Sequence, residues 1–112
     1  MKIYHNPRCT KSRETLALLN SLTEEVEVVE YLNNVPTVEE LKSLLTKLGM
    51  KAVELIRKNE TVYKELYKGK TLTENQWIEA MVNHPKLIER PIVVSGNKAV
   101  IGRPPENVKL LF

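Results

Sequence analysis

Residues 4–13 read Tyr4-His5-Asn6-Pro7-Arg8-Cys9-Thr10-Lys11-Ser12-Arg13, and they join a short apolar strand to a leucine-rich helix. Residues 1–5 alternate apolar and polar side chains, which predicts a half-exposed strand. Asn6-Pro7 breaks this strand, and the following leucines at spacings of three and four predict a helix. Residues 26–31 are rich in valine and predict a second strand. Strand, helix and strand together predict a βαβ unit with parallel strands and a right-handed crossover.

The middle of the chain predicts helices. Thr37 and Glu40 have the spacing of a capping box, four leucines follow at helical spacing, and Gly49 supplies a stop. Residues 51–58 predict a short helix whose inward side chains are Val53 and Ile56, and residues 61–67 predict a further helical turn. A second capping box, Thr73 to Gln76, opens a helix that ends at His84-Pro85.

The last part of the chain predicts a hairpin and a final helix. Residues 92–94 are purely apolar and predict a strand. Ser95-Gly96-Asn97 is a turn sequence, and residues 98–101 predict the second strand of the hairpin. Beyond Pro104-Pro105 we expect a helix that buries Val108, Leu111 and Phe112. The whole order, βαβ…ββα, predicts an α/β protein of the thioredoxin-like type. It has a four-stranded mixed sheet, one domain over residues 1–112, and a helical insertion at about 37–84. Pro91, just before the third strand, stands where this fold places a cis-proline.

Composition limits the function classes. The net charge of +3 and the scattered lysines weakly favour an anionic ligand and argue against a nucleic-acid partner. No apolar run approaches the roughly 20 residues that span a membrane, and no secretion signal is visible, so we expect a cytoplasmic protein without a membrane partner. We also expect a monomer. One cysteine and two distant histidines do not form a tetrahedral metal set, so no metal is predicted. We also expect no bound cofactor.

Cys9 is the candidate nucleophile, since the thiolate is the reactive form of cysteine. Partial positive charge at the start of the helix and the nearby basic side chains would lower its pKa. His5 and the hydroxyl of Ser12 could hydrogen-bond the sulfur. In the alternative interpretation, Cys9 is a small buried apolar residue, although its neighbours are charged and prolyl. His5 could equally be a structural histidine, and Ser12 could merely satisfy the first turn of the helix.

The motif Cys9-x-x-Ser12 lacks a second cysteine. A Cys-x-x-Cys protein can resolve its own mixed disulfide, whereas this chain needs an external thiol for any redox turnover. In a reducing cytoplasm, glutathione as co-substrate and a glutaredoxin as partner are the expected sources.

Residues 5–15 closely resemble the active-site turn of the glutaredoxin-dependent arsenate reductases, the ArsC family. Residues 55–58, 84–94 and 101–106 are similar to further segments of that family, in the same order and at matching intervals. The resemblance covers essentially the whole chain, and its nearest branch is a group of short bacterial ArsC-like proteins. The turn here is more basic than Ala-Cys-Gly-Thr-Ser in the best-known members, and the resemblance does not include the C-terminal extension that some relatives carry.

The resemblance implies a reaction and a set of residues. Cys9 would attack arsenate and form a thiol-bound arsenic(V) ester, and His5 and Ser12 would tune the thiolate. Glutathione would then displace water, and glutaredoxin would reduce the adduct and release arsenite. The arsenate, or a similar tetrahedral oxyanion, would be held by Arg57, Arg90 and Arg103. Guanidinium groups suit this role because they bind such oxygens bidentately and keep their charge.

Three weaker alternatives remain at this stage. Each arginine alone could be a surface ion pair, and Lys58 could take the place of Arg57. The chain could be a general oxidoreductase that acts on glutathione mixed disulfides. It could also be a non-enzymatic regulator of the Spx type that binds RNA polymerase, although the redox-sensing members of that group carry Cys-x-x-Cys.

Overall fold

The computed structural model describes residues 1–112, and the chain divides into two compact units. The first unit comprises Met1–Asn34 and Arg90–Phe112, and the second comprises Val35–Glu89. The second unit contains the segment predicted as a helical insertion, with a few more residues at each end. No helix is long and apolar enough to cross a membrane.

The first unit is built on a four-stranded mixed sheet with the strand order β2-β1-β3-β4. Strands β1 (Lys2–His5) and β2 (Glu27–Glu30) run parallel, and helix α1 (Thr10–Leu22) connects them. β1 is antiparallel to β3 (Ile92–Ser95), which forms a hairpin with β4 (Lys98–Ile101). This is the predicted thioredoxin-like arrangement.

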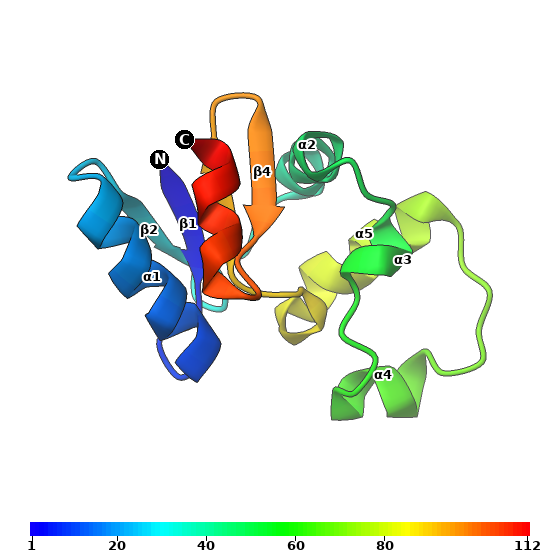
Figure 1. Cartoon of the computed structure of the whole chain (residues 1–112). Coiled ribbons are helices and arrows are strands. Elements are labelled where there is room, and N and C mark those ends of the chain that lie inside the picture. Colours follow the sequence, from blue (N-terminus) through cyan, green and yellow to red (C-terminus); the bar gives the residue numbers. More distant parts are fainter. The chain divides into compact units, whose positions relative to one another are not determined.

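Two helices cover one face of this sheet. The 3-10 helix η2 (Pro105–Leu111) lies beside α1 in Figure 1, and both pack against the strands. Their shared core consists of fully buried side chains from α1, β1, β3 and η2, namely Leu19, Ile3, Val93 and Val108. Ile3 and Val93 are paired across the two strands, so both point to the covered face. Burial of each such side chain stabilises the fold by about 1.5–3 kcal/mol.

The hairpin has the turn predicted from the sequence, whereas the end of the chain differs in part from its prediction. The turn between β3 and β4 is the predicted one, and Gly96 has φ +57°, a value that favours glycine. The final helix is a 3-10 helix, which buries Val108. The prediction that Phe112 faces inward is wrong, because its side chain is 62% exposed. Phe112 follows the last residue of η2 and is not part of the core cluster that contains Val108.

Short helices make up most of the second unit. In chain order they are α2 (Val38–Leu48), α3 (Ala52–Leu55), α4 (Thr61–Leu66), α5 (Glu74–Asn83) and the 3-10 helix η1 (Pro85–Leu87). The two predicted N-caps are confirmed: Thr37 accepts a hydrogen bond from the Glu40 amide, and Thr73 accepts one from the Gln76 amide. Gly49 ends α2 in the left-handed conformation, as predicted.

The predicted helix over residues 51–58 is shorter in the structure. α3 ends at Leu55, and its buried side chains are Ala52 and Leu55, while Val53 is only half-buried. Ile56 is buried as predicted, but as part of a β-bridge with Ile88. Tertiary pairing of residues 56 and 88 therefore replaces the last helical turn that the local pattern indicated.

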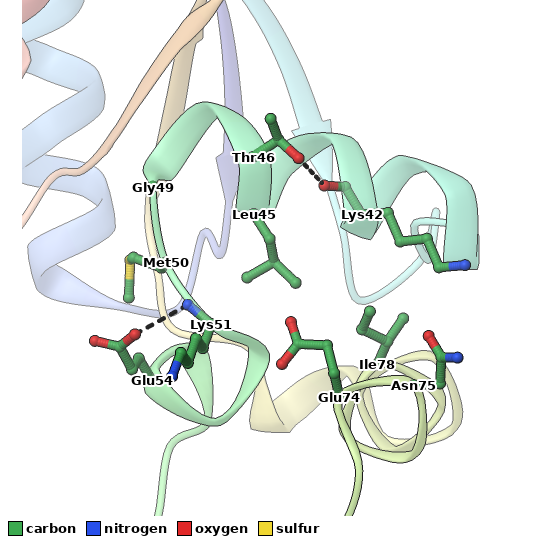
Figure 2. Close-up of a pocket in the computed structure, with 10 residues that line it drawn as sticks. All are labelled: Lys42, Leu45, Thr46, Gly49, Met50, Lys51, Glu54, Glu74, Asn75 and Ile78. Atoms are coloured by element: carbon green, nitrogen blue, oxygen red, sulfur yellow. Dashed lines mark hydrogen bonds between the residues drawn. The ribbon is translucent and has the colours of Figure 1, made fainter.

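A cavity of about 520 Å³ opens in the second unit between α2, α3 and α5 (Figure 2). Its walls include Leu45 and Ile78, and both carboxylate oxygens of Glu74 accept hydrogen bonds from the Ala52 amide. Its lining contains no cysteine, histidine or arginine. None of the residues predicted to carry the chemistry lies on this cavity.

Candidate active site

The candidate active site begins with the turn that links β1 to α1. Cys9 is the N-cap of α1, with extended backbone angles, and its carbonyl accepts the first helical hydrogen bond from Arg13. The Cys9 amide donates to the Asn6 carbonyl at 3.0 Å, and the Arg8 amide donates to the Asn6 side chain at 3.0 Å. These bonds close the turn and fix the sulfur at the start of the helix.

Cys9 is 8% exposed, and its surroundings favour the thiolate. Burial raises the pKa of the Cys9 thiol, but the main-chain N–H of Ser12, the charge of Arg90, the N–H of Lys11 and the charge of Arg103 together lower this pKa below its ordinary value. The amides at the start of α1 therefore act on the sulfur as the helix-terminus argument predicts.

Arg103 contacts the sulfur of Cys9 directly. Its Nη2 is 3.8 Å from Cys9 Sγ, within range of a weak N–H···S hydrogen bond. Arg90 belongs to the same unit, and its charge also acts on the thiol. The Arg90–Pro91 peptide bond is cis, and so is the bond between Arg103 and Pro104.

The sequence suggested that the Ser12 hydroxyl hydrogen-bonds the sulfur, but in the structure this hydroxyl has other partners. Its side chain is fully buried, and its Oγ lies 2.6 Å from His5 Nδ1 and accepts a hydrogen bond from the Asn6 amide at 3.0 Å. Only the main-chain N–H of Ser12 acts on Cys9. A sequence shows that a serine can form a hydrogen bond near a cysteine. Which of several possible partners the hydroxyl binds depends on the folded structure.

His5 is buried at the end of β1 and hydrogen-bonds Ser12 rather than the thiol. Burial lowers the pKa of His5, Glu30 raises it, and Arg13 lowers it further; the net direction is down. At neutral pH the imidazole is therefore uncharged. In this state it can accept the Ser12 hydroxyl hydrogen at Nδ1, and the resulting bond ties the end of the strand to the helix.

Arg57 lies in the second unit and is engaged by carboxylates. Its side chain is 11% exposed, its Nη1 forms a short ion pair with Glu60, and its Nε is 3.6 Å from Glu89 Oε1. Lys58, the predicted substitute, is exposed. The structure thus brings His5, Ser12, Arg90 and Arg103 together with Cys9 in one unit, and the place of Arg57 in the site stays a prediction.

Two residues of the site were not recognised in the sequence. Arg13 was assigned only a general positive charge, but its guanidinium donates to the Pro7 carbonyl at 2.9 Å and to Thr10 Oγ1 at 3.1 Å. Thr15 was not singled out, although it is fully buried and donates to the carbonyl of Gly102. A signal for Thr15 was available, because it lies four residues before Leu19 on the buried face of α1.

Comparisons with known proteins agree over nearly the whole chain. The sequence model of the ArsC family matches residues 4–111. The uncharacterized protein YfgD of Escherichia coli strain K12 is 54% identical over 110 residues, covering 96% of this chain and 92% of that protein. The arsenate reductase of Haemophilus influenzae is 45% identical over 108 residues, covering 95% of this chain and 93% of that protein. The solved structure of the arsenate reductase from Vibrio cholerae superposes with a TM-score of 0.94 at 48% identity, covering 100% of this chain and 98% of that chain.

Proposed function

Because the chain belongs to the ArsC family, we propose that it is an arsenate reductase that uses Cys9 as its nucleophile. The observation that carries the proposal is the placement of a guanidinium 3.8 Å from a thiol whose pKa is lowered. A thiolate beside a fixed cation can receive a tetrahedral oxyanion and attack it. The relatives from Haemophilus influenzae and Vibrio cholerae, which are named arsenate reductases, support the choice of arsenate.

The first step of the proposed reaction is attack of the Cys9 thiolate on arsenic. An S–As bond forms, and one arsenate oxygen leaves as water after taking up protons. Arg103 and Arg90 balance the charge of the oxyanion, and Arg57 would add a third guanidinium after releasing Glu60 or Glu89. The main-chain amides at the start of α1 would hydrogen-bond the oxygens, as helix N-termini do for other anions.

The electrons for reduction come from outside the chain, because Cys9 is its only cysteine. Glutathione would displace a second oxygen as water and form an As–S bond. A glutaredoxin thiolate would then take the glutathione sulfur as a mixed disulfide, leaving two electrons on arsenic. Hydrolysis of the remaining Cys9–arsenic(III) bond releases arsenite and returns the thiol.

The test is arsenite formation by the purified protein with glutathione, glutaredoxin and NADPH regeneration. We expect turnover in the wild type and none above background in Cys9→Ser. Arg103→Gln separates this reaction from general thiol exchange. Loss of a charge-assisted hydrogen bond to the oxyanion costs about 1.5–3 kcal/mol, or a fall in kcat/KM of about 10- to 150-fold. Equal arsenite formation in the wild type and Cys9→Ser would refute the proposal. Removal of glutathione from a mixed disulfide at an unchanged rate in Arg103→Gln, without any arsenate turnover in the wild type, would favour the thiol oxidoreductase.

A further inference from the structure

A buried hydroxyl joins the helix that carries Cys9 to the loop that carries Arg103. Thr15 Oγ1 lies 2.7 Å from the Gly102 carbonyl oxygen and 2.9 Å from the carbonyl oxygen of Lys11, one turn earlier in α1. The bond to Lys11 is the local one that helical threonines often form. The shorter bond, to Gly102, joins residues that are 87 positions apart in the sequence, so the local geometry of the helix does not explain it.

The main chain at Gly102 is held from two sides. A Cβ atom placed on Gly102 would lie 2.5 Å from Thr15 Cγ2 and 3.1 Å from Pro91 Cγ, so only glycine allows this approach. The Gly102 amide also donates to the Pro91 carbonyl at 2.8 Å. Thr15 and Pro91 thus fix the peptide from which the next residue projects.

That next residue is Arg103, whose Nη2 lies 3.8 Å from Cys9 Sγ. Arg103 has a long side chain, so the position of its guanidinium shifts with the position of its main chain. Its reach to Cys9 Sγ therefore depends on where its main chain is anchored. The anchor and the nucleophile share one rigid element, because Thr15 and Cys9 lie six residues apart at the start of α1.

We propose that Thr15 is a positioning residue: its hydroxyl anchors the Gly102 carbonyl to α1 and thereby holds the Arg103 guanidinium against the Cys9 thiolate. The inference rests on the proposed roles of Cys9 and Arg103. A purely structural hydrogen bond would alter stability alone. A positioning bond must also alter the thiolate and its affinity for an oxyanion, and it must do so through Arg103.

The test compares Thr15→Val, which keeps the shape but lacks the donor, with Thr15→Ser, which keeps the donor. Alkylation of Cys9 by iodoacetamide is followed against pH, with and without sulfate as a tetrahedral dianion, and urea unfolding is measured in parallel. In Thr15→Val we expect the alkylation midpoint to move up in pH and sulfate protection to weaken about fivefold. Thr15→Ser should stay close to the wild type. Ile3→Val, a core change in β1, is the control for lost stability and should leave both readouts unchanged.

Thr15→Val in an Arg103→Gln background tests whether the hydroxyl of Thr15 acts through Arg103. There Thr15→Val should cause no further change in midpoint or in sulfate protection. A wild-type midpoint and protection in Thr15→Val would overturn the inference, and so would changes of equal size with and without Arg103. If Thr15→Val does not fold, Gly102→Ala probes the same contact from the other side and should raise the midpoint. Because no arsenate turnover is measured, failure here is distinct from failure of the proposed reductase activity.

Discussion

Replacement of Ser12 by alanine should destabilise the protein while leaving the thiolate in place. The Ser12 hydroxyl lies 2.6 Å from His5 Nδ1 and 3.0 Å from the Asn6 amide nitrogen. Without it, a buried ring nitrogen and a partly buried amide lose their partner. Each such group costs about 1–3 kcal/mol, and water can reach Asn6, so the expected loss is about 2–4 kcal/mol. The pKa of Cys9 should stay lowered, because the Ser12 main-chain N–H remains.

The assay combines thermal unfolding with pH-dependent alkylation of Cys9. An unfolding entropy of about 2.1 cal/mol/K per residue gives about 0.24 kcal/mol/K for this chain, so Tm should fall by about 8–17 °C. Ser21→Ala is the matched control, because Ser21 lies on the same helix and donates only to the exposed Leu18 carbonyl. Its Tm should change by about 2 °C or less. A raised alkylation midpoint in Ser12→Ala, with a Tm like that of Ser21→Ala, would show that the hydroxyl acts on the sulfur and would refute the reasoning.

Three further predictions concern Gly102 and His5 of the first unit and Glu60 of the second. Gly102→Ala should lower the free energy of unfolding in urea by about 1–3 kcal/mol, because its Cβ would meet Thr15 Cγ2 at 2.5 Å; a neutral result would contradict the close approach. The pKa of His5 is lower in the folded chain than in the unfolded chain. On acidification, the unfolded chain therefore takes up this proton at a higher pH than the folded chain does. The stability that His5 contributes is thus fully present above about pH 6.5 and is lost as the pH falls through its lower folded-state pKa. His5→Asn should remove this part of the pH profile of stability, and an unchanged profile would exclude His5 as its source. Glu60→Gln should lower the KM for arsenate by releasing Arg57 from a competing carboxylate, and an unchanged KM would argue against a role of Arg57 in oxyanion binding.

Local chemistry explains why so much of the fold was predictable. The N-caps Thr37 and Thr73, the stop at Gly49 and the turn at Gly96 depend on a few neighbouring residues, so the sequence carries the whole signal. The failures occur where distant contacts compete with local ones. Ile56 leaves its predicted helix because Ile88 offers a β-bridge.

In the candidate site, too, local features were predictable from the sequence, and features that depend on distant contacts were not. Cys9 at the mouth of a helix was predictable, because a single cysteine in a basic turn is a local pattern. The partners of Ser12 were not, since a hydroxyl can serve several acceptors and donors, and only the position of His5 at the end of β1 selects among them. Thr15 was missed because its important bond is to a residue 87 positions away.

The sequence by itself therefore determined the order of strands and helices, the position of the single cysteine at the start of a helix and the absence of a second cysteine beside it. Each of these follows from residue identity and local spacing along the chain. Only the tertiary structure decided that Arg103 reaches Cys9, that the Ser12 hydroxyl supports the turn rather than the sulfur, and that Arg57 is paired with Glu60 and Glu89. These facts depend on distances between segments that lie far apart in the chain, and a pattern of residues along the chain does not contain those distances.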